Sequence, residues 1–258
     1  MLKAILFDLG DTLFDTRPMR LWQVFEEGGR DAYTYLTGLG YKLPPFPRYF
    51  AMHKRAVQAW FVWSRVVGGE VNCERILRRI AVRLGLDLGE EVFREMTWLW
   101  YSPTVRHNQV APDVIPMLTR FRDRGLKLAI VSNTFVPAFV LDRHLEIENL
   151  LQFFPHRVYS SELNLRKPDR RVFEQALRLV GVEPGEAIFV GDNIRNDILG
   201  ARRAGMLAIL KRPASETRTH RVADHLVRTM RELEQILPLL GAPTDFELSA
   251  APGLACGA

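Results

Sequence analysis

Asp8 is the residue of this chain whose type and position point most directly to chemistry. It follows the apolar run 4–7, where a turn after a short buried strand can expose the next side chain. In open α/β sheets, ligands bind in the crevice beyond the carboxyl ends of the strands. The position therefore predicts a nucleophilic carboxylate. The second residue after Asp8 is Gly10, which has no ionisable side chain, and an acid appears one step later at Asp11.

Polar side chains follow two other apolar runs in the same way, and a lysine stands between them in the sequence. After the run 127–131, hydroxyl and amide groups can donate hydrogen bonds to an anionic oxygen, whereas the run 187–190 leads to carboxylates. The residues concerned are Ser132, Asn133, Lys167, Asp192 and Asp197. Because ligand sites form at the carboxyl edge of such sheets, we expect these side chains to face the same crevice as Asp8.

Three of these groups, Asp8, Asp192 and Asp197, are carboxylates that would repel one another in a single crevice. A cation removes this repulsion, and hard oxygen ligands suit Mg²⁺, which keeps several waters and also contacts phosphate groups. The sequence therefore predicts a magnesium site and an anionic substrate.

The elements that position these residues alternate between short apolar runs and stretches of helical periodicity. This alternation is typical of a parallel sheet with crossover helices, so we predict an α/β fold with a Rossmann-like three-layer core. Gly125, Gly181 and Gly205 stand where helix ends favour a residue that tolerates positive φ. The predicted strands span 4–7, 127–131, 156–159, 187–190 and 206–210, and the predicted helices span 112–124, 137–144, 170–180 and 197–204.

Between Thr16 and Asn108 the strand pattern gives way to amphipathic helices. These are predicted over 20–39, 49–67, 72–84 and 90–101. We therefore expect a catalytic core of residues 1–16 and 109–240, a helical insertion of residues 17–108, and a disordered tail over 241–258. All five tryptophans lie in the insertion, and most of them are predicted to pack in its core.

Composition and charge exclude several classes of protein. Of the 258 residues, 47% are hydrophobic, which is ordinary for a globular protein. We expect a cytoplasmic protein, because no run approaches the roughly 20 apolar residues of a membrane helix and no signal peptide is apparent. The two cysteines provide no disulfide framework. Residues 17–107 hold 14 basic and 9 acidic residues, which accounts for the net charge of +5.

No nucleic-acid motif accompanies this positive charge. The expected partner is therefore a small anionic molecule, and neither nucleic acid nor a membrane. Monomer and homodimer both stay open.

Taken in this order along the chain, the motifs resemble those of the haloacid dehalogenase superfamily of aspartate-nucleophile hydrolases. The resemblance covers residues 1 to about 240, and the helical insertion resembles the cap between that superfamily's first two motifs. It implies that Mg²⁺ is ligated by Asp8, the backbone carbonyl of Gly10 and Asp192, with Asp197 acting directly or through water.

The same resemblance implies a phosphatase that acts on a small phosphorylated metabolite. Lys167, Ser132 and Asn133 would hold the phosphoryl group. Asp8 would attack it and form an aspartyl-phosphate, which water then hydrolyses.

Gly10 departs from the pattern of these phosphatases, which usually have an Asp there that protonates the leaving oxygen and later activates water. General acid–base catalysis is typically worth roughly 10²–10⁴-fold, so its loss would slow the hydrolysis of alkyl phosphates most. Three explanations stay open: Asp11 handles the proton, the cap or the substrate handles it, or the natural reaction needs no strong acid.

Two alternatives to a phosphatase also stay open. Dehalogenases of the superfamily lack the same Asp, because they form an alkyl ester that needs no proton for the leaving group. They need no magnesium, however, whereas Asp192 and Asp197 look like the metal-binding version. A non-catalytic binding protein is compatible with the lost acid, but the other motif residues are retained. Within the cap, Arg17, Arg20 and Arg106 are the first candidates for substrate contacts.

Overall fold

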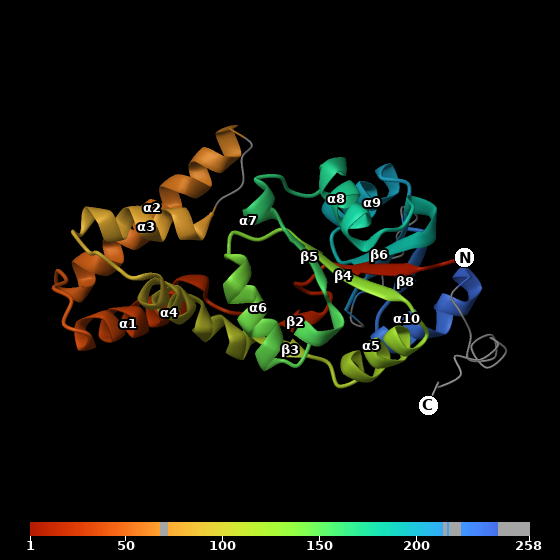
Figure 1. The fold of residues 1–258 in the computed structure, drawn as a ribbon, viewed down its shortest axis with the longest axis horizontal. Helices are drawn as coiled ribbons and strands as arrows, with labels where there is room; N and C mark the ends of the chain where they lie inside the picture. Colours follow the sequence, from red (N-terminus) through yellow and green to blue (C-terminus); the bar gives the residue numbers. More distant parts are fainter. Residues whose placement is uncertain (68–71, 214–215, 217–222, 242–258) are drawn as a thin grey trace, which may run out of the picture.

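The structure is a computed structural model that describes residues 1–67, 72–213, 216 and 223–241. Its centre is a six-stranded sheet in the order β5-β4-β1-β6-β7-β8, in which each neighbouring pair is parallel (Figure 1). The strands are β1 (Ala4–Phe7), β4 (Lys127–Ser132), β5 (His156–Tyr159), β6 (Ala187–Gly191), β7 (Leu207–Lys211) and β8 (His225–Val227). The predicted α/β fold with a parallel sheet is confirmed.

Helices cover both faces of this sheet, so the core has three layers. Ile5 and Phe7 of β1 belong to one hydrophobic cluster, and Ala4 and Leu6 belong to the cluster on the opposite face. Because successive side chains of a strand point to opposite faces, a strand buried on both faces is apolar throughout. One face carries α5 (Val114–Asp123), α6 (Ala138–Ile147) and α10 (Met230–Ile236), and the other carries α8 (Arg170–Val180) and α9 (Leu199–Arg203).

The five predicted strands agree with the observed ones to within one residue at each end, and the helix predicted over 170–180 coincides with α8. Gly125, Gly181 and Gly205 have φ values of 76°, 69° and 88°, as predicted for residues that follow helices. The pattern does not predict β8, nor an antiparallel pair formed by β2 (Phe14–Thr16) and β3 (Asn108–Val110). Each of these strands has only three residues, which is too short to show a period.

The helix predicted over 197–204 differs from the observed structure in kind. A π-helical turn at Ile194–Ile198 precedes α9, so the helical backbone begins three residues before the predicted start. Asn193 caps this turn, since its side-chain oxygen accepts a hydrogen bond of 2.9 Å from the backbone N of Asn196. Isolated π-helical turns occur frequently at functional sites, and this one contains Asp197.

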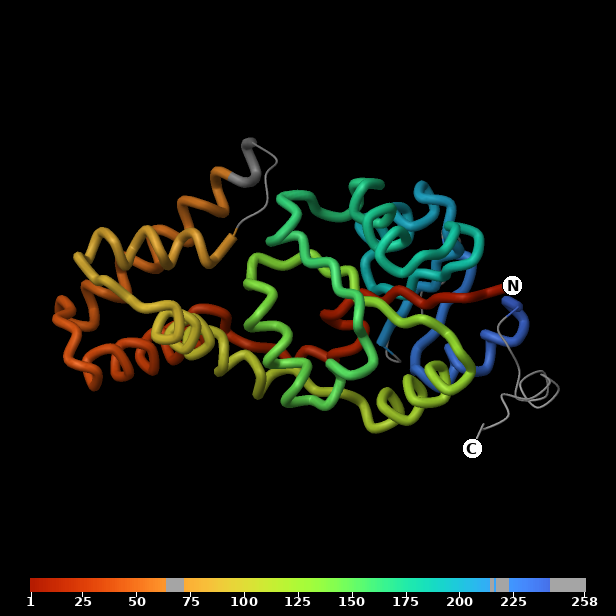
Figure 2. The backbone as a smooth tube through the Cα atoms, in the orientation of Figure 1, coloured from red at the N-terminus to blue at the C-terminus, as the bar shows by residue number. Residues whose placement is uncertain are grey.

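Between β2 and β3 the chain forms α1 (Leu21–Gly38), α2 (Phe46–Val67), α3 (Cys73–Arg83) and α4 (Glu90–Tyr101). These helices lie together at one end of the molecule (Figure 2), and we call residues 21–101 the helical unit. They have a hydrophobic cluster of their own that includes Leu36, Phe93 and Trp100. α2 begins at Phe46, three residues before the predicted start, because Pro47 is tolerated in the first helical turn.

The tryptophans of the helical unit follow the expectation only in part. Trp98 and Trp100 are buried, whereas Trp22 and Trp63 are 39% and 45% exposed. Trp100 packs in the cluster of the helical unit and Trp60 against a smaller cluster there, as predicted, whereas Trp98 belongs to the cluster on the sheet. The ammonium group of Lys54 lies 5.0 Å from the centre of the Trp22 ring, so Trp22 serves as a platform for a cation.

The two connections between the helical unit and the sheet run side by side. Phe14 pairs with Val110, and Thr16 pairs with Asn108, so β2 and β3 form a short antiparallel ribbon. Among the described residues no helix has the length and apolar character that crossing a membrane requires. The predicted disordered tail lies, from residue 242 onward, outside the described residues.

Candidate active site

The central strand β1 brings the predicted motifs to one edge of the sheet. Phe7 pairs with Ile130 of β4 on one side and with Val190 of β6 on the other. Beyond these pairs lie Asp8 after β1 and Ser132 at the end of β4. Asp192 directly follows β6 in the same direction. The carboxyl ends of three adjacent strands therefore carry three of the predicted motifs.

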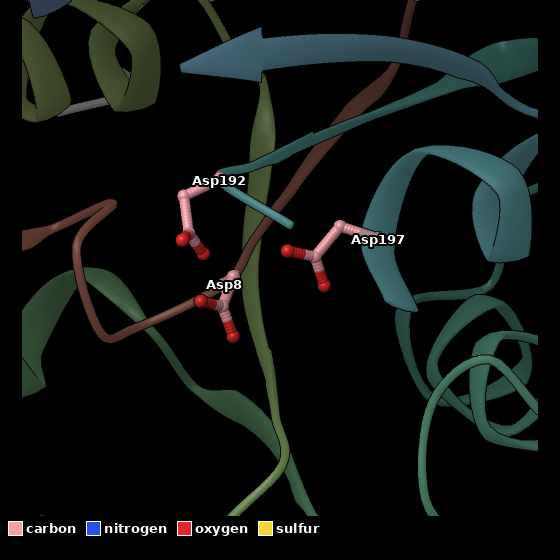
Figure 3. Close-up of side chains that lie close together, drawn as sticks. All are labelled: Asp8, Asp192 and Asp197. Carbon is pink, nitrogen blue, oxygen red and sulfur yellow. The ribbon is translucent and has the colours of Figure 1, made fainter. Parts of the chain in front are cut away.

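Asp8, Asp192 and Asp197 form a cluster at this edge. Each offers a carboxylate oxygen, and these oxygens all lie within 4.8 Å of one another. Figure 3 shows the three carboxylates converging on a common space from the end of β1, the end of β6 and the π-helical turn. Asp8 and Asp197 are buried, whereas Asp192 is partly exposed. Sequence reasoning placed all three in one crevice, and the structure brings them together.

Asp197 is held tightly against the end of β6. A Cβ atom built on Gly191 would lie only 2.6 Å from the Asp197 side chain, so only glycine permits this approach. The Oδ2 atom of Asp197 also accepts a hydrogen bond of 2.9 Å from the backbone N of Asn193. This contact depends on the path of the π-helical turn, which the sequence pattern does not show.

Lys167 lies between two of the three carboxylates and is almost completely buried. Its Nζ atom donates hydrogen bonds to Asp8 Oδ1 at 2.7 Å and to the carbonyl of Val131 at 2.8 Å. It also lies 2.6 Å from Asp197 Oδ1, an ion pair without hydrogen-bond geometry. Burial alone would lower the pKa of Lys167, but the charges of Asp8 and Asp197 outweigh it and raise the pKa.

Burial is the main cause of raised pKa values at two carboxyl groups of this cluster. Burial raises the pKa of Asp8 to about 6; Lys167 opposes this shift and Asp197 adds to it. Burial also raises the pKa of Asp192 to about 7, and the charges of Asp8, Asp197 and Asp11 add to that shift. Three carboxylates therefore cluster with the ammonium group of Lys167. A divalent cation held by oxygen ligands fits this donor set.

The structure places Ser132 and Asn133 in different roles. Ser132 is buried at the end of β4, beside Tyr159 of β5. Both polar atoms of the Asn133 side chain bind the backbone of Lys167: Nδ2 donates to its carbonyl at 2.9 Å, and Oδ1 accepts from its N–H at 2.7 Å. Asn133 therefore positions Lys167, and its amide is already engaged.

The loop between Asp8 and β2 carries the two other predicted residues. Gly10 forms an isolated bridge with Phe14. Asp11 has a φ of 54°, and its Oδ1 accepts a hydrogen bond of 3.2 Å from the backbone N of Thr16. The exposed Asp11 side chain thus closes the loop, yet it also lines a cavity of about 650 Å³ that Asp192 reaches.

Two further observations concern residues outside these motifs. Arg106 forms a 2.6 Å ion pair with Glu27 on the surface of the helical unit, and Arg17 and Arg20 are exposed.

Lys211 lines the same cavity as Asp11 and Asp192, and sequence reasoning missed it. It stands at the end of an apolar strand, and that position is the signal that would have found it.

Known proteins resemble this chain in sequence. A family model described as haloacid dehalogenase-like hydrolase matches residues 2–205. The glyceraldehyde 3-phosphate phosphatase of Methanopyrus kandleri is 31% identical over 212 residues, which cover 81% of this chain and 83% of that protein.

Two solved structures resemble this fold over nearly its whole length. The crystal structure of a haloacid dehalogenase (HAD) phosphatase from Thermococcus onnurineus has 28% identity and a TM-score of 0.58, and the match covers 92% of this chain and 98% of that one. A 2-haloacid dehalogenase from Pseudomonas syringae pv. Tomato DC3000 has 22% identity and a TM-score of 0.62, with 93% and 99% covered, which shows the fold alone. This chain belongs to the haloacid dehalogenase-like hydrolase family.

Proposed function

We propose that this protein is a Mg²⁺-dependent phosphatase that acts on a small phosphorylated metabolite through an aspartyl-phosphate. The observation that carries the proposal is the convergence of Asp8, Asp192 and Asp197, with the ammonium group of Lys167 in contact with Asp8. The similarity to a phosphatase of Methanopyrus kandleri and to a solved HAD phosphatase supports it.

The oxygen atoms at this edge of the sheet indicate which residues would hold the metal ion. Asp8, the backbone carbonyl of Gly10 and Asp192 would be direct ligands. Asp197 would act through water, because one of its oxygens lies against Lys167 and the other accepts from the backbone of Asn193. Bound Mg²⁺ would neutralise the carboxylates and the phosphoryl oxygens.

The side chains of this chain would then share the chemistry. Asp8 attacks the phosphorus atom, the bond to the leaving oxygen breaks, and the aspartyl-phosphate forms. Lys167 orients Asp8 and stabilises negative charge on the transferring group, and the Ser132 hydroxyl donates to one of its oxygens. Water next hydrolyses the aspartyl-phosphate, which releases inorganic phosphate and restores the carboxylate.

Asp11 is our candidate for the proton transfers that Gly10 cannot perform. Its carboxylate shares a cavity with Asp192, although it also accepts the hydrogen bond from Thr16. If Asp11 transfers protons, Asp11→Asn lowers kcat for alkyl phosphates and leaves that for p-nitrophenyl phosphate nearly unchanged, because nitrophenolate needs no proton to leave. Equal losses on both substrates assign Asp11 to loop structure instead.

We propose further that residues 17–108 serve as a cap over this site. The cap touches the loop that follows Ser132: the rings of Phe61 and Phe135 lie 5.6 Å apart, and the backbone N of Cys73 donates to the carbonyl of Phe135 at 2.9 Å. Because these contacts lie beside the carboxyl edge of the sheet, they suit a lid that excludes water from the reaction. The positive charge of this segment suits an anionic substrate.

The experiment that tests this function uses p-nitrophenyl phosphate with Mg²⁺. The wild-type protein is expected to release nitrophenolate, and both Asp8→Asn and an excess of EDTA are expected to abolish the release. Equal rates for wild type and Asp8→Asn would contradict an enzyme that acts through Asp8. Halide release from a 2-haloacid in the presence of EDTA would favour the dehalogenase instead.

A further inference from the structure

Lys211 belongs to none of the predicted motifs, but it forms hydrogen bonds with the loop that follows Asp8. It is the last residue of β7, and only 7% of its surface is exposed. Its Nζ atom donates to the backbone carbonyl of Thr12 at 2.9 Å and to Asp15 Oδ1 at 2.6 Å. We call residues 9–16 the nucleophile loop. One buried ammonium group thus contacts this loop at two points, three residues apart.

Other hydrogen bonds close the nucleophile loop on itself, and its last three residues pair with β3. The backbone N–H groups of Leu13 and Phe14 both donate to the carbonyl of Leu9 at 3.0 Å, and Thr16 donates to Asp11. These bonds shape the loop and link its end to β3, but they do not connect it to the six-stranded sheet. The contacts of Lys211 do so, because Lys211 belongs to β7.

The register of the sheet places Lys211 next to a predicted metal ligand. Gly191 of β6 pairs with Leu210 of β7, so the next residues, Asp192 and Lys211, emerge beside each other at the carboxyl edge. Both also line the cavity of about 650 Å³ that Asp11 reaches from the loop. Lys211 therefore connects the loop that carries Gly10 to the strand next to the one that carries Asp192.

We propose that Lys211 is a positioning residue for the magnesium site. It holds Thr12 and Asp15 so that the carbonyl of Gly10 lies at the distance from Asp192 that a shared cation requires. This inference rests on the proposed function, since it assumes that the two groups bind one cation. Lys211 itself would touch neither the metal ion nor the substrate.

A role through position and a role through charge predict opposite effects on metal binding. Lys211 is a positive charge close to the carboxylates of Asp11, Asp15 and Asp192. If its charge alone mattered, its removal would make the site more negative and Mg²⁺ would bind more tightly. If its position matters, its removal frees the loop and Mg²⁺ binds more weakly. The sign of the change separates the two roles.

The test is calorimetric titration of Mg²⁺ into the full chain without substrate, for wild type and Lys211→Met. Methionine has a similar length and volume but neither the charge nor the donors. Residues that orient metal ligands typically change affinity by 10–100-fold, so we expect binding to weaken by about tenfold or more. Lys127→Met is the matched control, because the Nζ atom of Lys127 also donates to a backbone carbonyl, that of Val180 at 2.8 Å, but at the amino end of β4. Its affinity for Mg²⁺ should equal that of wild type.

Lys211→Arg retains the charge but changes the reach of the side chain, so its affinity should fall between those of wild type and Lys211→Met. An unchanged or tighter affinity in a folded Lys211→Met protein overturns the proposal. If circular dichroism shows that Lys211→Met does not fold, the Mg²⁺ affinity of Lys211→Arg tests the proposal instead. An affinity of Lys211→Arg equal to that of wild type then overturns the proposal. A wild-type protein that binds no Mg²⁺ contradicts the magnesium site itself, so failure of the proposed function is recognised separately.

Discussion

Gly10 is the residue at which this site departs from the phosphatases that it resembles, and its surroundings have room for a side chain. A Cβ atom built on Gly10 meets no heavy atom within 4 Å. Its φ also lies outside the left-handed region, so a larger residue causes no backbone strain there. The absence of a carboxylate at this position is therefore a chemical feature of the site and not a steric requirement.

Gly10→Asp should therefore be a gain-of-function variant. A carboxyl group at this position would protonate the leaving oxygen more directly than Asp11, whose side chain also holds Thr16, and we expect kcat for alkyl phosphates to rise by roughly 10²-fold. The rate for p-nitrophenyl phosphate should change little. Steady-state kinetics on both substrates measure the effect, and Gly10→Asn, which has the same shape but no carboxyl group, is the control. Equal rates for the Asp and Asn variants would refute the assignment of the acid position.

The residues of the site show where sequence reasoning reaches its limit. Asp8 and Asp192 are found from the sequence because each directly follows an apolar run. That both polar atoms of Asn133 bind the backbone of Lys167 is not visible, because 34 residues separate the two. The need for glycine at position 191 is equally hidden, since it arises from the side chain of Asp197, which the π-helical turn folds back against β6.

At the scale of elements, the helical unit is held together by an unusually close approach of α1 and α4. A Cβ atom on Gly28 would lie 2.3 Å from the backbone oxygen of Trp100. On Gly29 it would lie 2.6 Å from the Trp100 ring. The Gly28-Gly29 pair therefore allows the backbone of α1 to rest against α4. Without it, the helices must move apart and lose contacts in the cluster around Leu36 and Phe93.

Gly28→Ala should destabilise the protein in spite of the better helix propensity of alanine. Overpacking of a close contact typically costs about 1–3 kcal/mol, and here the obstacle is backbone, which cannot rotate away. Urea unfolding measures the loss. Gly38→Ala, in the same helix but with open space around the built Cβ, is the control and should be neutral or slightly stabilising. The same loss of stability in both variants would contradict the close-packing argument.

The elements that sequence reasoning found are those with enough residues to show a period. The apolar run of β1 and the helix α8 are predicted with their observed bounds, because burial on both faces or on one helical stripe dictates their residue types. β2, β3 and β8 are not predicted, because a strand of three residues is compatible with any period. The pairing of β2 with β3 depends on where the chain rejoins the core after residues 17–107, and the local sequence pattern does not encode this position.

At the scale of the whole molecule, both parts bury a neutral histidine. His53 lies in the helical unit, where burial lowers its pKa to about 4 although the carbonyl of Tyr49 opposes the shift. Burial also lowers the pKa of His144 in α6 to about 4. The His144 ring stacks on Phe14 and binds the hydroxyl of Tyr101 at 2.8 Å, so it joins the core to the end of the helical unit.

These histidines should make the protein less stable in mild acid. Their pKa values are lower in the folded chain than the ordinary value near 6.5, so the unfolded chain binds more protons and stability falls as the pH drops from 6.5 towards 4. The full difference corresponds to about 3 kcal/mol for each histidine. Urea unfolding at pH 7.5, 6 and 5 measures the trend.

Replacement of both side chains, His53→Phe with His144→Phe, should flatten this dependence on pH. His225→Gln is the control, since His225 is only partly buried in the folded protein. A double variant whose stability falls as steeply as that of wild type between pH 6.5 and 5 would show that other groups cause the acid sensitivity.

In the proposed mechanism, Asp8 carries the phosphoryl group during turnover. Quenching the reaction with p-nitrophenyl phosphate and Mg²⁺, followed by borohydride reduction, converts an acyl phosphate into a primary alcohol that mass spectrometry locates. We predict that the carboxyl group of Asp8 is reduced to the alcohol, and only when substrate and Mg²⁺ are both present. An unmodified Asp8 in protein that is turning over substrate, or reduction of a different carboxyl group, would contradict the account.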